Sequence, residues 1–163
     1  MLFRSIKLYK KINNVQYYWE TWDVDKNTSV IHWGMVGEEG ENKIVRSSIL
    51  KVFNKEIKKE LDYKIKDGYL PLNDDQIETL IIEYKIDGFG SENDFEKRTR
   101  LQDSLNEFLG WRGLGNCDGG STGSGTMEVF CLVTDYKIAH QKVIKFLEKT
   151  EFSDYVRIYN EER

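Results

Sequence analysis

A single proline, Pro71, stands in this chain of 163 residues, and it constrains the fold more than any other feature. Proline cannot donate a backbone hydrogen bond, so the segment Gly68–Asp75 around it is predicted to be an irregular connection. A helical pattern precedes this segment and a strand pattern follows it. We therefore predict two modules, one over residues 1–70 and one over residues 76–163.

The first module carries the pattern of an antiparallel sheet followed by one helix. Segments rich in aromatic and β-branched residues are separated by turn residues, at 4–11, 15–24, 28–36 and 42–46. Apolar residues then recur at helical spacing, at Leu50, Phe53, Ile57 and Leu61. Ser47 or Ser48 is the expected helix cap. Three or four strands with one covering helix form a complete small core.

Ordered landmarks in this module resemble a known family. They are the run His32-Trp33-Gly34-Met35-Val36-Gly37-Glu38-Glu39-Gly40, a helix with an inward Phe53, and Lys66-Asp67-Gly68-Tyr69. Together they resemble the WGR domain over roughly residues 3–70. That domain is best known from poly(ADP-ribose) polymerases, where it contacts DNA and relays binding to other domains. The resemblance implies a nucleic-acid contact, for which Trp33, Lys43 and Arg46 are the candidate binding residues.

Two features reduce the expected affinity for DNA. Position 35 is Met where the family motif has Arg, and methionine cannot bond a phosphate bidentately. Glu38, Glu39 and Glu41 follow and repel a phosphate backbone. We expect weak or no duplex binding at physiological salt. Trp33 itself is either a core residue or a flat ring offered to a ribose or base.

The second module is predicted to be a ferredoxin-like βαββαβ domain. The pattern runs strand, helix, strand, strand, helix, strand, with strands near 79–86, 113–121, 126–134 and 155–160. The fold class of the whole chain is therefore α+β.

A glycine-rich run over residues 113–125 lies within this module. Its candidate residues are Gly119, Gly120, Gly123 and Gly125. Consecutive backbone N–H groups in such a loop can cradle an anion. The run lacks the Gly-Lys-Ser/Thr ending of a phosphate-binding loop, so a mobile hairpin tip is the main expectation.

The predicted strand at 126–134 is apolar on both sides, with Phe130 and Leu132 on one of them. A strand that is apolar on both sides expects cover on both faces of its sheet. We also expect Tyr155, Arg157 and Tyr159 on the open face, with Val156 and Ile158 pointing toward the helices. This face is the candidate interface for a protein partner or for self-association.

Charge divides unevenly between the modules. Residues 1–70 hold 13 Lys/Arg and 10 Asp/Glu, for +3, and residues 71–163 hold 11 and 18, for −7. No nucleophile–base pair can be placed together from the sequence, so no catalytic residue is predicted, and neither is a metal site or a cofactor. Cys117 and Cys131 are expected to be reduced. The absence of a long apolar run favours a cytoplasmic location without membrane contact.

Three functions are compatible with these residues. The first is a non-enzymatic, two-module binding or adaptor protein. The second is a nucleic-acid-binding protein acting through the WGR-like module. The third is an enzyme that uses the glycine-rich 113–125 loop as a substrate cradle.

Overall fold

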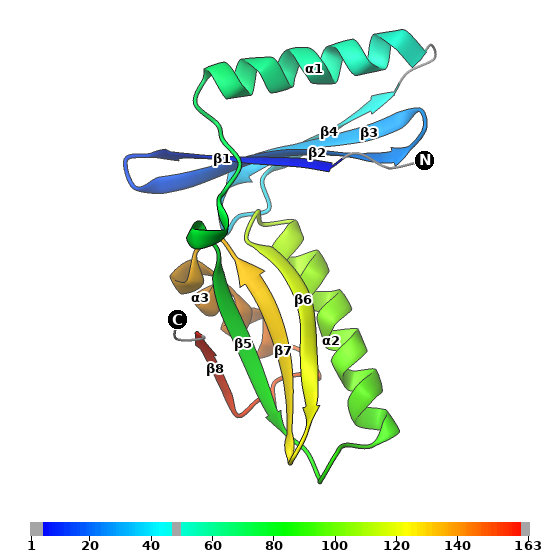
Figure 1. Cartoon of the computed structure of the whole chain (residues 1–163), viewed down its shortest axis with the longest axis vertical. Helices are drawn as coiled ribbons and strands as arrows, with labels where there is room; N and C mark the ends of the chain where they lie inside the picture. The colour runs from blue at the N-terminus through cyan, green and yellow to red at the C-terminus, as the bar shows by residue number, and fades with distance from the viewer. Residues whose placement is uncertain (1–4, 47–49, 161–163) are drawn as a thin grey trace. The chain divides into compact units, whose positions relative to one another are not determined.

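The computed structural model describes residues 5–46 and 50–160, with backbone alone for residues 50–54. The chain divides into two compact units, residues 1–73 and 74–163. Each unit contains an antiparallel four-stranded sheet, and the described residues include three α-helices (Figure 1). The chain is therefore mixed α+β, as the sequence predicts.

The amino-terminal unit is a meander of four strands with one helix. The strands are β1 (Ser5–Ile12), β2 (Val15–Asp25), β3 (Thr28–Met35) and β4 (Glu41–Arg46), and they lie in the sheet in chain order. Asn13 and Asn14 have φ values of 49° and 65°, which close the two-residue turn between β1 and β2. Helix α1 (Leu50–Lys66) runs over one face of this sheet (Figure 1).

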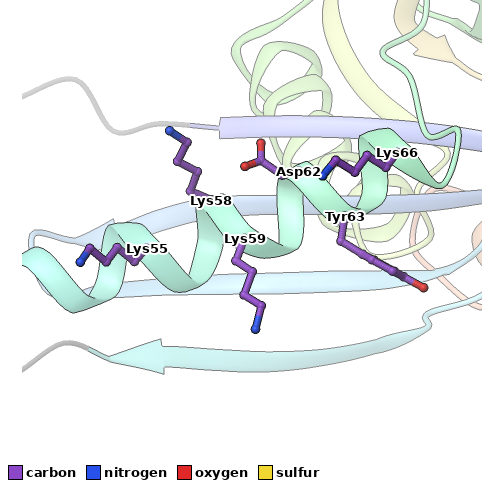
Figure 2. A pocket seen from close by; sticks show the side chains of 6 residues that line it. All are labelled: Lys55, Lys58, Lys59, Asp62, Tyr63 and Lys66. Atoms are coloured by element: carbon purple, nitrogen blue, oxygen red, sulfur yellow. The ribbon is translucent and has the colours of Figure 1, made fainter.

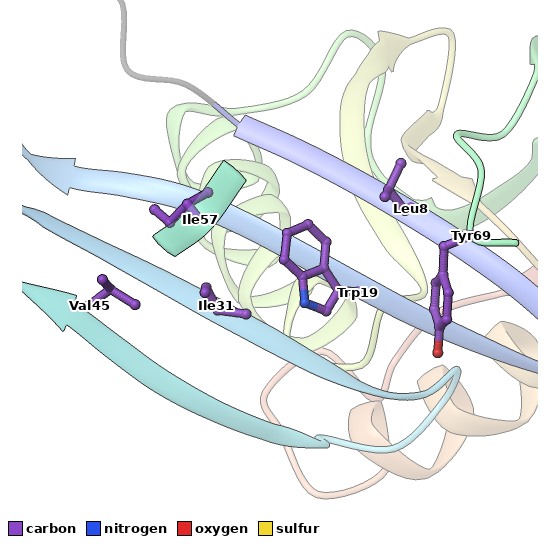
Figure 3. Packing of buried hydrophobic residues seen from close by; sticks show 6 residues of the cluster. All are labelled: Leu8, Trp19, Ile31, Val45, Ile57 and Tyr69. Atoms are coloured by element: carbon purple, nitrogen blue, oxygen red, sulfur yellow. The ribbon is translucent and has the colours of Figure 1, made fainter. Parts of the chain in front are cut away.

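The core of this unit lies between the sheet and α1. Its buried members are Leu8, Trp19, Ile31, Val45, Ile57 and Tyr69, shown in Figure 3. Trp19 and Ile31 are 1% and 0% exposed, and Ile57 of α1 is 0% exposed. Leu61 packs against this cluster, as its helical spacing predicts. The side chains of Leu50 and Phe53, and the predicted caps Ser47 and Ser48, lie outside the described residues.

The opposite face of the same sheet carries a buried polar network. His32 is fully buried, and its Nδ1 lies 2.7 Å from Oε1 of Glu20. Its Nε2 lies 2.6 Å from the carbonyl oxygen of Glu39 and 3.0 Å from the hydroxyl of Tyr18. Lys7 pairs with the second oxygen of Glu20 at 2.9 Å. These contacts give the buried polar groups partners, which a sheet face without a helix must supply.

Gly34 explains how the β3–β4 connection reaches this network. A Cβ at Gly34 would lie 2.7 Å from Cα of Gly40, so only glycine lets the connection approach β3 so closely. The Tyr18 hydroxyl then donates to the carbonyl oxygens of Glu38 and Glu39 at 3.1 and 2.9 Å. The connection is thereby held on the sheet face that points away from α1.

The carboxy-terminal unit follows a short 3₁₀ turn at Asp74–Gln76. Its elements are β5 (Glu78–Lys85), α2 (Glu92–Gly110), β6 (Gly115–Gly123), β7 (Thr126–Val133), α3 (Tyr136–Leu147) and β8 (Arg157–Asn160). The strand order in the sheet is β6-β7-β5-β8, and every pair is antiparallel. Ser91 and Asp94 form a capping box at the start of α2, and Asp135 caps α3.

Alternation along β7 separates the two faces of this second sheet. Met127, Val129, Cys131 and Val133 are fully buried, while the residues between them are half-buried. Leu80, Ile82 and Tyr84 of β5 stand beside them by register and are also buried. The helices complete this core with Leu101, Leu105, Leu109, Ala139, Val143 and Leu147.

The two facing tryptophans of the amino-terminal unit should contribute unequally to its stability. Trp19 pairs with Trp33 across β2 and β3, but Trp33 is only partly buried. Trp19→Ala should lower the free energy of unfolding by about 3–5 kcal/mol, the usual cost of deleting a buried aromatic ring. Trp33→Ala should cost less, because part of its ring already contacts water. Urea titrations followed by far-ultraviolet circular dichroism measure both, and equal losses would contradict the assignment.

Candidate polyanion-binding surface on α1

The side chains of helix α1 contact the rest of its unit in three ways. Ile57 points into the core beneath the helix. Glu56 and Glu60 point toward β4, where both carboxylates pair with the ammonium group of Lys43. Lys64 places its ammonium 4.7 Å from the ring centroid of Tyr69. The remaining outer side is left to face solvent.

This outer side forms a shallow depression of about 410 Å³ that we call the lysine face. It is lined by Lys55, Lys58, Lys59, Asp62, Tyr63 and Lys66. All six side chains are exposed, and Figure 2 shows them spreading from the outer side of α1. With four lysines and one aspartate, its formal charge is +3.

The spacing of these residues concentrates positive charge on α1, and repulsion between the like charges destabilises the helix. Lys55 and Lys59 are four residues apart, so they stand one above the other and repel. Asp62 is four residues from both Lys58 and Lys66 and offsets part of the repulsion there. The lysine face therefore remains basic after its one acid is counted.

The lysines and the tyrosine of this surface suit a phosphorylated polymer. A lysine ammonium carries three donors that bond phosphate oxygens without demanding one orientation. Tyr63 is 65% exposed and lies near the carboxy-terminal end of the same surface, where its ring can stack on an unpaired base. The lysine face was not among the residues singled out from the sequence, although lysines at helical spacing over 55–66 are visible there.

The structure does not gather the three predicted binding residues into one surface. Trp33 packs partly against the core beneath α1. Lys43 is engaged by Glu56 and Glu60. Arg46 is exposed at the far end of β4, where it pairs by register with Thr28, and alternation turns it to the face opposite Lys43.

The glycine-rich run 113–125 is mostly strand: the predicted strand near 113–121 is present as part of β6, and the alternative prediction of one mobile loop over 113–125 is wrong. Nine of its residues form strand β6, and Gly119 and Gly120 pair with Phe130 and Val129 of β7. Turns lie at the two ends of the run: Gly113 belongs to the turn after α2, and Ser124 and Gly125, with φ values of 53° and 87°, turn between β6 and β7. The glycines therefore do not cradle an anion together.

Close backbone approach explains why a strand contains so many glycines. A Cβ at Gly120 would lie 2.3 Å from the carbonyl oxygen of Glu128, and one at Gly115 would lie 1.9 Å from that of Leu132. A bulge between Cys117 and Gly119 also interrupts the ladder. Glycine at positions 115 and 120 therefore allows close packing against β7.

The open face of the second sheet has an apolar part and a polar part. Phe130 and Leu132 are half-buried on it, and Ile81, the register partner of Phe130, is 5% exposed. Tyr159 donates to Glu128 at 2.7 Å, and this hydrogen bond, more than burial, raises the pKa of the Tyr159 phenol to about 12. Arg157 bonds Glu83 at 2.7 Å, and this contact raises the pKa of its guanidinium.

Two residues depart from the predicted arrangement of the last strand. β8 begins at Arg157, so Tyr155 and Val156 precede it. Val156 is 56% exposed rather than inward, because its backbone reaches Glu83 just before the ladder begins. The pKa of the Tyr84 phenol is raised mainly by burial and also by the nearby Asp154 and Tyr155. Tyr155 is half-buried and lies outside the paired residues of β8.

Within the described part of the chain, no three His, Cys, Asp or Glu side chains gather as a metal site would require. No helix among those same residues is long and apolar enough to cross a membrane. Comparisons with protein-family models, curated proteins and solved structures found no match to this chain. Its function is therefore argued from its own geometry.

The strand assignment of the glycine run makes a testable prediction. Gly120→Ala should destabilise the carboxy-terminal unit by about 1–3 kcal/mol, because the new methyl group meets the backbone of β7. Gly110→Ala is the matched control, since its Cβ would meet nothing within 4 Å and it lies in α2. That control should be neutral or gain up to about 1 kcal/mol. Thermal unfolding measures both, and a Gly120→Ala protein as stable as wild type would point to a loop.

Proposed function

We propose that this chain is a non-enzymatic binding protein of two modules, and that its lysine face holds the phosphate backbone of a nucleic acid weakly and without reading sequence. The observation that carries the proposal is that four exposed lysines and the exposed ring of Tyr63 lie together on the outer side of α1. Lysine contacts with phosphate provide the sequence-independent part of nucleic-acid binding.

The architecture supports the two finer fold assignments that we propose. A four-stranded meander with one helix, with Gly34 against Gly40 and Tyr69 in the core, fits a WGR-like module. The βαββαβ order with strand order β6-β7-β5-β8 fits a ferredoxin-like domain. The WGR resemblance adds an independent reason to expect a nucleic-acid contact in the first unit.

The acidic connection between β3 and β4 does not oppose this proposal. Its carbonyl groups at Glu38 and Glu39 bond Tyr18, whose side chain lies on the sheet face opposite Trp19 and the helix. The connection is thereby held across the sheet from α1. Asp62 is the one acid that lines the lysine face.

Salt dependence tests the proposal directly. Four lysine contacts should give a slope of log K against log salt of about −3.6 for duplex DNA and about −2.8 for a single strand. At physiological salt the dissociation constant should fall between about 1 and 100 μM. Lys55→Gln, Lys58→Gln, Lys59→Gln and Lys66→Gln combined should bring the slope close to zero. Fluorescence anisotropy with labelled oligonucleotides measures both quantities.

A lysine control and a tyrosine variant make this experiment specific. Lys137→Gln, Lys145→Gln and Lys149→Gln remove exposed lysines of the other unit and should leave the slope unchanged. Tyr63→Ala should weaken single-strand binding more than duplex binding, because only unpaired bases can stack on its ring. Equal loss in the two lysine sets would mean that net charge, rather than the lysine face, drives binding.

The open face of the second sheet favours a second role, contact with a protein partner or a second copy of the chain. Phe130 and Leu132 flank the buried Ile81 there, while the polar end of the face is already internally bonded. The apolar end is thus the part that a partner would cover. An adaptor needs such a second surface in addition to the lysine face.

Phe130→Ser with Leu132→Ser tests this second role. If the apolar end is an interface, the double variant should lose self-association or partner binding while far-ultraviolet circular dichroism stays that of wild type. Sedimentation velocity measures the assembly state. Thr79→Ser, on the same face beside Leu132, serves as the control. Unchanged assembly and unchanged stability would remove the interface from the proposal.

A further inference from the structure

The β6–β7 hairpin places the two cysteines of the chain directly opposite one another. Cys117 of β6 and Cys131 of β7 are register partners in the antiparallel ladder. Both are free thiols, and their side chains interact. Facing positions in an antiparallel pair send their side chains to the same side of the sheet.

The backbone around Cys117 suits a covalent link between the strands. Its N–H donates to Oδ1 of Asn106 in α2 at 2.7 Å instead of donating to β7. Its carbonyl oxygen accepts from the side-chain amide of Asn116. Cys117 is therefore at a non-hydrogen-bonded position, where facing Cα atoms lie about 4.5 Å apart. This separation falls within the range that disulfides span.

The two thiols differ in access to solvent. Cys131 is 0% exposed within the core, while Cys117 is half-buried. The interaction with Cys117, together with burial, raises the pKa of the Cys131 thiol. An oxidant from solvent therefore reacts first with Cys117. Cys131 remains a protonated thiol until the sulfur of Cys117 has been oxidised.

We propose that Cys117 and Cys131 form a reversible intramolecular disulfide when the protein meets a peroxide or a low-molecular-weight disulfide. In a reducing compartment the pair remains two thiols until such an oxidant accumulates. The pair is a covalent modification site in the second unit and is independent of the lysine face.

The reaction with peroxide balances in two steps. The Cys117 thiolate attacks one peroxide oxygen, the O–O bond breaks, and the departing hydroxide takes a proton to leave as water. The Cys131 sulfur then attacks the sulfenic sulfur of Cys117, and its thiol proton leaves with the displaced hydroxide as a second water. Two thiols lose two electrons, and the peroxide gains them. With oxidised glutathione, two exchange steps release two molecules of glutathione instead.

The linked state would fix an edge strand to its neighbour. β6 lies at the edge of its sheet, and the bulge next to Cys117 leaves the ladder irregular there. A bond between Cys117 and Cys131 joins the strands beside this bulge, where Cys117 also meets α2 through Asn106. The link therefore stabilises the end of the hairpin that the ladder holds least well.

Oxidation of the full chain by hydrogen peroxide, followed by alkylation of remaining thiols in denaturant, tests the proposal. Mass spectrometry should find one species in which both thiols are lost together and the mass is lower by two hydrogens. Non-reducing electrophoresis should show a monomer, and reduction should restore both thiols. A protein oxidised at Cys117 alone with Cys131 still alkylated, or one linked between chains, would overturn the proposal.

A glutathione redox buffer separates a preorganised pair from two cysteines that are merely near in sequence. The equilibrium constant for disulfide formation should be at least about tenfold larger in the native protein than in urea, because the fold holds the sulfurs together. An equal or smaller constant overturns the proposal. In Cys131→Ala, glutathione should stay attached to Cys117, and in Cys117→Ser the buried Cys131 should resist alkylation until unfolding. A Cys117 that stays unmodified in Cys131→Ala also overturns the proposal.

Discussion

The amino-terminal unit depends on the contact between Ile57 of α1 and the tryptophan-bearing face of its sheet. α1 is the helix that covers this face, and full burial of one such side chain stabilises a fold by about 1.5–3 kcal/mol. Most of the stability of a helix in a protein comes from the packing of its apolar side rather than from propensity, so docking on the sheet must hold α1. The lysine face therefore exists as a defined surface only while the core beneath it is intact.

This dependence couples binding to stability. A polyanion on the lysine face relieves the repulsion between Lys55 and Lys59 and so favours the docked helix. Any ligand that binds the folded state alone raises stability with its concentration. Core residues such as Trp19 thus support binding although none of them touches the ligand.

On the other face of the same sheet, buried polar groups must have hydrogen-bond partners. Glu20, His32 and Tyr18 are buried on the face opposite α1, and each has hydrogen-bond partners that offset the cost of leaving water. Those partners include main-chain carbonyls of the β3–β4 connection, which Gly34 admits close to the sheet. A glycine beside Trp33 therefore serves loop placement, and the fully buried tryptophan is Trp19.

Patterns that depend on periodicity were predictable from the sequence, and those that depend on contacts were not. The strands of the first unit, the helix with Ile57 and Leu61, and the mixed α+β class follow from alternation and helical spacing. A strand near 113–121 was predicted, but a loop over the whole run was predicted as well because glycine usually marks turns. The backbone contacts that require Gly115 and Gly120 lie across strands and were not visible in the sequence. The ion pairs of Lys43 could not be predicted, because its partners Glu56 and Glu60 belong to a helix that comes later in the chain.

Charge and length together limit how strongly the lysine face can bind. The first unit carries +3 and the second −7, but at physiological ionic strength charges separated by more than about 8 Å in water are largely screened. The lysines over residues 55–66 therefore act locally, and at a helical rise of 1.5 Å per residue they span about 16 Å. A strand of B-form DNA offers a phosphate about every 3.4 Å along its axis, so this span faces roughly five phosphates with four cations. So few contacts hold a polymer weakly, and an adaptor of this kind would rely on its second surface for lasting association.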